Sequence, residues 1–245
     1  MCRHLAYLGP RRELSDLLFN PPHSLLHQTY LPNDMRGGGT VNVDGFGVGW
    51  YGETRRPIRY RRSTPMWTDA GFTEIARATA STAVVAAVRS ATIGLPINDA
   101  ACAPFSDDRW LFSLNGRIEG WPHTAAEFAK QLPITDILTL EALTDTALIW
   151  AVVKRRLADG EDAGRVLTSV LQELAAANQG SRLNFLLTDG ETVYATTWTH
   201  SLSLRQGADY VLLSSEPLDE HPDWQPVPDA HLVVATPTAV SMTAI

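Results

Sequence analysis

Cysteine at position 2 is the feature of this chain that most suggests catalysis. If an aminopeptidase removes Met1, which requires a small second side chain, Cys2 carries both a thiol and a free α-amine. The thiolate is the nucleophilic form of cysteine, and an unperturbed thiol has a pKa near ~8.5. An α-amine titrates at ~7.7–8.0, so near neutral pH it can accept the thiol proton. One residue would then supply nucleophile and base, as in N-terminal threonine enzymes. Taken alone, however, Cys2 is more simply a small residue near the chain start.

The pair Asn115-Gly116 closes an apolar segment at 110–114. A side-chain amide and a nearby main-chain N–H are suitable donors to the oxyanion that develops when a carbonyl carbon is attacked. One such donor can contribute ~3–4 kcal/mol to catalysis. Asn-Gly is also the strongest two-residue signal for a β-hairpin, and the spacing alone favours that turn.

Arg89 and Asp145 are two charged residues that border apolar segments. Arg89 ends an apolar run at 83–88, where desolvating a guanidinium is costly unless it meets an anion. Its planar fork matches a carboxylate, and an internal salt bridge would serve equally well. Asp145 precedes an apolar helical segment and could hold an ammonium group. The spacing alone favours a helix cap, provided by Thr144 or by Asp145 itself.

Three other motifs are interpreted as structural. Residues 47–52 fit the pattern G-x-G-x-x-G, but they are strand-like and lack the following helix that a dinucleotide fingerprint needs. Cys102 has no charged neighbour in sequence, so we expect a buried structural thiol. Five arginines between positions 55 and 62 alternate with other residues, which predicts the solvent-facing side of a strand.

The elements that must position these residues follow from the apolar patterning. Segment 36–52 is rich in glycine, and Asp189-Gly190 predicts a hairpin. Strands are predicted at 3–9, where Gly9-Pro10 should end the first, and at 46–51, 83–89, 110–114, 184–188, 192–196, 210–214, 231–235 and 239–243. Helices are predicted at 13–19, 69–79, 144–157 and 162–177. Strands, then helices, then strands indicate an α+β fold with two sheets between helix layers.

Composition limits the classes of partner. The chain of 245 residues has 20 Lys and Arg against 27 Asp and Glu, a net charge of -7 that argues against a nucleic-acid surface. No signal peptide and no membrane-spanning run are apparent. Two cysteines are too few for a disulfide framework, which favours the cytoplasm. The seven histidines lack zinc-site spacing, so we expect no metal and no cofactor.

The order of several segments resembles one protein family. The segments are 1–2, 44–51, 89–94, 115–118, 144–146, 183–190 and 214–218. Together they resemble the glutaminase domain of class II (N-terminal nucleophile) glutamine amidotransferases over essentially the whole chain. Residues 1–5, 21–26 and 44–51 are most similar to the stand-alone γ-glutamyl hydrolases of ergothioneine biosynthesis.

This resemblance implies a role for each candidate residue. Cys2 would attack the γ-carbonyl of a small γ-glutamyl substrate, with its own α-amine as base. Asn115 and Gly116 would form the oxyanion hole. Attack would give a glutamyl thioester, which water would then hydrolyse to glutamate.

The same resemblance implies how the substrate is held and which fold holds it. Arg89, together with Thr92, would bind the α-carboxylate of the glutamyl group, and Asp145 would bind its α-ammonium. Such positioning would place the γ-carbonyl beside the thiol. The implied fold is a four-layer αββα sandwich, with two mainly antiparallel sheets between helix layers, formed by residues 1–245 as one domain.

Two departures from the family pattern and several alternatives remain open. Many members carry histidine where this chain has Leu114, and a polar residue where it has Ile93; both positions are expected to neighbour the site. The chain ends soon after the last family-like strands, which favours hydrolysis over ammonia transfer to an attached synthase domain. The alternatives are a glutaminase subunit of a separate synthase, a hydrolase of glutathione-like conjugates, and an inactive binding protein. Homo-oligomerisation is also open.

Overall fold

The computed structural model describes residues 2–36 and 41–245, so Met1 and residues 37–40 of the glycine-rich segment lie outside the described residues. The strands are β1 (Arg3–Glu13), β2 (Phe46–Tyr51), β3 (Pro57–Arg62), β4 (Ala80–Val88), β5 (Phe105–Ser106), β6 (Leu111–Arg117), β7 (Arg182–Thr188), β8 (Val193–Thr197), β9 (Ser203–Gln206), β10 (Val211–Ser214), β11 (Gln225–Pro226), β12 (His231–Thr236) and β13 (Ala239–Ala244). The α-helices are α1 (Leu14–Leu18), α2 (Leu25–Gln28), α3 (Ala70–Ala78), α4 (Ala126–Ala129), α5 (Ile134–Leu138), α6 (Asp145–Ala158) and α7 (Ala163–Ala177).

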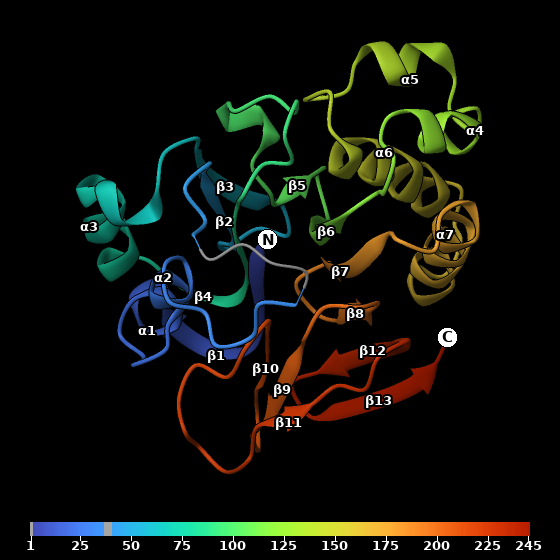
Figure 1. Ribbon diagram of the computed structural model, residues 1–245. Helices are drawn as coiled ribbons and strands as arrows, with labels where there is room; N and C mark the ends of the chain where they lie inside the picture. The colour runs from blue at the N-terminus through green and yellow to red at the C-terminus, as the bar shows by residue number, and fades with distance from the viewer. Residues whose placement is uncertain (1, 37–40) are drawn as a thin grey trace.

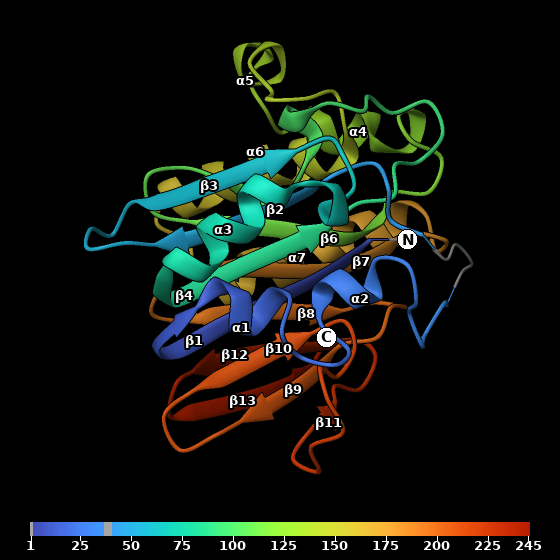
Figure 2. The ribbon, with the colours of Figure 1, turned by 90° about the vertical axis from the view of Figure 1, so that its left-hand side faces the viewer.

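The strands form two antiparallel sheets that lie face to face. One sheet has the order β11-β9-β10-β1-β4-β2-β3, and the other has the order β13-β12-β8-β7-β6-β5. Helices α1, α2 and α3 lie beside the first sheet, and helices α6 and α7 lie beside the second (Figure 1). The side view places α1 and α3 in front of strands β1 and β4 (Figure 2). The architecture is therefore the four-layer αββα sandwich that the sequence predicts.

Three layers of apolar side chains lie between the four layers of helices and sheets and hold them together. One packs α6 and α7 against the second sheet, one packs α1 and α3 against the first sheet, and one fills the space between the sheets. Successive side chains of a strand point to opposite faces, so Leu5 and Tyr7 of β1 face the helices, whereas Ala6 and Leu8 face the other sheet. Strand β4 is buried on both faces in the same way, which explains why its sequence is an almost unbroken apolar run.

Most predicted elements are confirmed, with one clear correction. Strand β1 does not end at Gly9-Pro10 but continues to Glu13, with a register shift in its pairing with β4 between Leu8 and Arg12. Proline is tolerated in a strand at such an irregularity, where its missing N–H breaks no ladder hydrogen bond. The predicted helix at 13–19 is correspondingly shorter, since α1 spans Leu14–Leu18.

The structural interpretation is confirmed for residues 47–52 and for the buried Cys102, and only in part for the arginines, because Arg59 and Arg61 are half-buried rather than solvent-facing. Gly47 and Gly49 lie in β2, and a Cβ on either would come within 2.5 Å of Ala103 O or Leu111 Cδ2. Close packing against the main chain at Ala103 and the side chain of Leu111 therefore explains these glycines. The arginines around β3 form ion pairs, among them Arg59 and Arg61 with Glu141. Across the described ranges, no helix is long and apolar enough to span a membrane.

Candidate active site

Cys2 directly precedes β1 of the first sheet. Arg3 pairs with Val88 of β4, so Cys2 is beside the residues that follow β4. Its Sγ is 3.8 Å from the carbonyl oxygen of Ser90. Extending the alternation of β1 by one step places the Cys2 side chain on the same side as His4 and Ala6, toward the second sheet. The thiol is half-buried, so a substrate can still reach it.

Asn115 lies in β6 of the second sheet and faces the first sheet. It pairs with Asn184 of β7, inside the strand, so the hairpin-turn interpretation of Asn115-Gly116 is wrong. Leu111, four residues away on the same face of the strand, belongs to the layer between the sheets. The Asn115 side chain is fully buried, and its Nδ2 donates to Ser215 Oγ at 3.3 Å. Asn115 thus reaches across the gap toward the sheet that carries Cys2.

Gly116 follows in the same strand, where no other residue fits. Its φ is +155°, and a Cβ at this position would lie 1.9 Å from the carbonyl oxygen of Arg182. Real Cβ atoms do not approach backbone oxygen so closely. Glycine is thus required by the close approach of β7 to β6, and it leaves the main chain beside Asn115 unobstructed.

Arg89 is held by its main chain at the end of β4. Its N–H donates to Gly45 O at 2.8 Å, and its carbonyl oxygen accepts from Asp44 N at 3.0 Å. The guanidinium donates through Nη1 to Pro96 O at 2.9 Å. Within 2–36 and 41–245, no carboxylate forms an ion pair with it, although Arg89 is 9% exposed. The internal salt bridge is therefore absent from the described structure, and an anionic ligand would compensate the buried charge.

Asp145 is a buried carboxylate at the start of α6. The helix cap is Thr144, whose Oγ accepts from Ala147 N at 3.2 Å. Asp145 accepts from Ile118 N at 3.0 Å and from Thr146 N at 2.7 Å. Burial raises the pKa of Asp145, while these two N–H groups and the charge of Arg89 act in the opposite direction. The positive charge of Arg89 thus acts on the Asp145 carboxylate, and this pair of opposite charges is suited to bind a zwitterionic group.

Thr92 and the two departures from the family pattern lie in different surroundings. Thr92 is half-buried in the turn after Arg89, and its carbonyl oxygen accepts from Leu95 N at 3.0 Å. Ile93 is fully exposed in this turn. Leu114 points away from the gap between the sheets, into the layer packed against α6 and α7. The expectation that Leu114 borders the site is therefore wrong, because neighbouring side chains of a strand face opposite ways.

A supporting ion pair next to Cys2 was missed by sequence reasoning. Arg3 Nη2 is 2.9 Å from Glu216 Oε1, and both side chains are at most 3% exposed. Glu216 also binds His23 Nε2 at 2.6 Å and accepts from Asn33 N at 2.8 Å. Burial acts to raise the pKa of Glu216, but these hydrogen bonds and Arg3 outweigh it, so the pKa lies below its usual range. Glu216 thus anchors the residue that follows the nucleophile, and the segment 214–218 was its only signal in the sequence.

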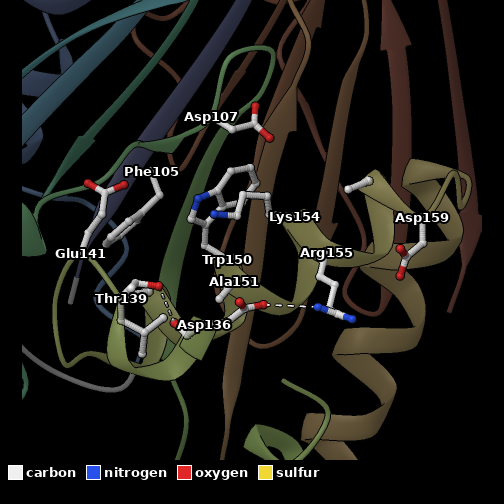
Figure 3. Close-up of a pocket in the computed structure, with 13 residues that line it drawn as sticks. Phe105, Asp107, Asp136, Thr139, Glu141, Trp150, Ala151, Lys154, Arg155 and Asp159 are labelled. Atoms are coloured by element: carbon white, nitrogen blue, oxygen red, sulfur yellow. Dashed lines mark hydrogen bonds and ion pairs between the residues drawn. The ribbon is translucent and has the colours of Figure 1, made fainter. Parts of the chain in front are cut away.

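A cavity of about 470 Å³ lies beside α6, away from these residues. Its walls include Phe105 and Trp150, and Arg155 of α6 pairs with Asp136 of α5 at its edge, 3.4 Å apart (Figure 3). None of the predicted catalytic or substrate-binding residues lines it. The chemistry of the side chains, and not this cavity, therefore indicates the candidate site.

Comparisons with known proteins decide the family. The family model described as glutamine amidotransferases class-II matches residues 17–213. A relative from Mycolicibacterium smegmatis, named gamma-glutamyl-hercynylcysteine sulfoxide hydrolase, is 40% identical over 245 residues and covers all of both chains. The chain belongs to the class II glutamine amidotransferases.

Two solved structures agree with this family in fold. A glutamine aminotransferase class-II domain protein from Silicibacter pomeroyi superposes with a TM-score of 0.69 at 21% identity, and 99% of each chain is covered. The glutamine phosphoribosylpyrophosphate amidotransferase from B. subtilis superposes with a TM-score of 0.66 at 13% identity, over 99% of this chain and 49% of the other. The sandwich fold and the family expected from the sequence are both confirmed.

Two buried histidines lie near the site of this class II amidotransferase. His4 and His200 are at most 3% exposed, and His4 Nδ1 is 3.3 Å from Ser113 Oγ. Within the described ranges, His4 Nε2 and His200 Nδ1 form no hydrogen bond. Burial, with the charge of Arg3 among the lesser causes, lowers the pKa of His4 to about 3 and that of His200 to about 4. Both rings are therefore neutral at pH 7.

These histidines should make the fold sensitive to acid. Below the ordinary histidine pKa of ~6.5, the unfolded chain binds protons that the folded chain rejects, so stability falls as the pH falls toward 4. Between pH 5.5 and 4.5, the free energy of unfolding of wild type should drop by about 1 kcal/mol more than that of His200→Gln. Urea denaturation at the two pH values measures this difference. Equal drops would contradict it, and exchange of the exposed His221 to Gln is the control.

Proposed function

We propose that this chain hydrolyses a γ-glutamyl amide bond through a thioester on Cys2. The observation that carries the proposal is the pair Arg89 and Asp145, two buried side chains of opposite charge that form no ion pair in the described structure. Arg89 adjoins Ser90, whose carbonyl oxygen is 3.8 Å from the Cys2 thiol, and Asp145 accepts from the N–H of Ile118, three residues after Asn115. A γ-glutamyl group ends in an α-carboxylate and an α-ammonium. Arg89 binds the carboxylate with help from Thr92, and Asp145 binds the ammonium. This arrangement selects the glutamyl head of the substrate.

The reaction then proceeds in two balanced steps. After removal of Met1, the α-amine of Cys2 takes the thiol proton, and Sγ attacks the γ-carbonyl carbon. The oxyanion is bound by Asn115 Nδ2–H and the main-chain N–H of Gly116, donors that act where charge develops. Collapse expels the amine, which takes the proton from the α-ammonium of Cys2, and leaves a thioester. Water then attacks the thioester and gives a proton to the α-amine. Collapse releases glutamate, and the leaving sulfur takes that proton back from the α-ammonium, which restores the thiol.

We propose γ-glutamyl-hercynylcysteine sulfoxide as the substrate, which places the reaction in ergothioneine biosynthesis. Support comes from the mycobacterial relative, whose name states this substrate and whose whole length aligns with this chain at 40% identity. The site draws on β1, β4, β6 and α6, so we also propose that residues 1–245 act as one glutaminase-like domain. Cys2 and Cys102 are both free thiols, in keeping with action in the cytoplasm.

The substrate is tested by a panel of γ-glutamyl compounds. Purified protein is incubated with γ-glutamyl-hercynylcysteine sulfoxide, L-glutamine or glutathione, and released glutamate is measured. We expect kcat/KM for the first to exceed the other two by at least ~100-fold, a difference of about 2.7 kcal/mol. Preference for glutamine would instead favour a glutaminase subunit, and preference for glutathione a hydrolase of such conjugates. Release from none of the three would favour a binding protein.

The variant Asp145→Asn tests whether the charge of Asp145 binds the α-ammonium of the glutamyl head. It keeps the shape of the side chain but loses its charge, and a charged hydrogen bond contributes about 1.5–3 kcal/mol. We therefore include it with an expected loss of ~10- to 100-fold in kcat/KM on the preferred substrate. The matched control is Asp159→Asn, just past the end of the same helix, which should keep wild-type values.

A further inference from the structure

We infer that Ser215 is a positioning residue that orients the Asn115 amide and joins it to the strand of the nucleophile. The inference rests on the proposed function, because it concerns the oxyanion hole of that reaction. Ser215 directly follows β10, and its side chain is fully buried. It lies between Asn115 on one sheet and His4 on the other, two residues after Cys2.

The Ser215 hydroxyl makes three hydrogen bonds, which use its full capacity. It donates its proton to His4 O at 3.2 Å. It accepts from His4 N at 3.0 Å and from Asn115 Nδ2 at 3.3 Å. A hydroxyl has one proton and two lone pairs. With the proton committed to the His4 carbonyl, only lone pairs face Asn115.

Donation of the Ser215 hydroxyl proton to His4 O determines which end of the Asn115 amide faces Ser215. The amide nitrogen carries two protons and the amide oxygen carries none, so the oxygen would be repelled by the serine lone pairs. The nitrogen therefore faces Ser215 and uses one of its protons there. Its second proton stays available for the oxyanion. With the amide reversed, Oδ1 would take the place of this donor and repel the developing negative charge.

Within the described structure, no other group fixes the amide orientation. Asn115 Oδ1 has no hydrogen-bond partner among residues 2–36 and 41–245, and Nδ2 has only the contact with Ser215. Both side chains are fully buried, where polar contacts are stronger than in water. Loss of the Ser215 hydroxyl would thus leave the amide free to turn over.

Ser215 also fixes the distance between the oxyanion donor and the nucleophile strand. Its main-chain N–H donates to His4 O at 2.9 Å, so the hydroxyl and the N–H together hold both main-chain polar groups of His4. Cys2 precedes His4 by two residues on this strand. Ser215 therefore binds both β1, the strand that follows the Cys2 nucleophile, and the Asn115 amide that stabilises the oxyanion.

The test compares Ser215→Ala with Ser214→Ala. Ser214 is the adjacent serine and is also fully buried, but its Oγ has no partner within the described residues. With γ-glutamyl-hercynylcysteine sulfoxide, we expect kcat of Ser215→Ala to fall ~10- to 100-fold, since losing a whole oxyanion donor costs 10²–10³. KM, and the inhibition constant of L-glutamate, should change less than about threefold in the same variant, because ground-state binding is untouched. Ser214→Ala should stay within about twofold of wild type in all three values.

A double-mutant cycle separates positioning from a general structural effect. If Ser215 acts through the Asn115 amide, adding Ser215→Ala to Asn115→Ala should lower kcat by less than about threefold further. Independent losses that multiply, or a wild-type kcat in Ser215→Ala, would overturn the inference. Absence of hydrolysis in wild type and Ser214→Ala would overturn the proposed function itself, and the inference with it.

Discussion

Exchange of Cys2 for alanine should lower kcat for γ-glutamyl hydrolysis by at least about 10⁴-fold. The variant retains Arg89 and Asp145, so glutamate should still bind with its wild-type inhibition constant. What is lost is the sulfur atom that forms the thioester in the proposed mechanism, and loss of a nucleophile in comparable enzymes costs up to about 10⁶ in kcat. A reduction in kcat without a change in glutamate binding would place Cys2 in the chemical step.

The measurement that assigns this role is intact mass spectrometry before and after a γ-glutamyl chloroketone. Wild type should lack Met1 and carry a single label on Cys2, since a retained Met1 would block the amine that serves as base. Cys102→Ala is the matched control, because Cys102 is fully buried and burial raises the pKa of its thiol to about 11. The control should be labelled and active like wild type. Retention of Met1 in active enzyme, or a label on Cys102, would contradict the mechanism.

The parts of the fold that the sequence predicted are those set by local pattern. Helix α7 carries an apolar stripe at helical spacing, and β4 is an apolar run because both its faces are buried. The strands that were missed are short, since β5 and β11 have two residues each and β9 has four, and they take their structure from pairing with neighbours. Their own residues carry no periodic signal long enough to detect.

The residues of the candidate site likewise fall into those that a local motif indicates and those that only the fold brings together. Cys2, Asn115 and Asp145 were proposed as site residues because the order of their short motifs resembles one family, whereas each motif alone favoured a structural role. Ser215 and Glu216 were not assigned roles, because their partners are far away in sequence: His4 is 211 positions from Ser215, and Asn115 is 100 positions from it. Which distant groups meet is decided by the order of strands in two sheets. Only the folded chain brings β1, β6 and the end of β10 together.

Exchange of Gly116 for alanine should damage both activity and stability. The new Cβ would lie 1.9 Å from Arg182 O and 2.6 Å from Arg182 C, atoms of a main chain that is paired to β6 and cannot turn aside. Relief requires β6 and β7 to separate where Asn115 and the Gly116 N–H are positioned. We expect kcat to fall at least ~100-fold, since both oxyanion donors move, and the free energy of unfolding to drop by about 3 kcal/mol.

The control for Gly116→Ala is Gly160→Ala, which separates the steric clash from the cost of an unusual φ. Gly160 follows α6 with a φ of +87°, and a Cβ there would meet nothing within 4 Å. This variant bears only the backbone cost of about 1 kcal/mol and should keep its wild-type kcat. Urea denaturation and steady-state kinetics on both variants give the comparison. If Gly116→Ala lost no more stability and no more activity than Gly160→Ala, the close approach of β7 would not be what requires glycine. The position of the Gly116 N–H in the oxyanion hole would then lose its structural basis.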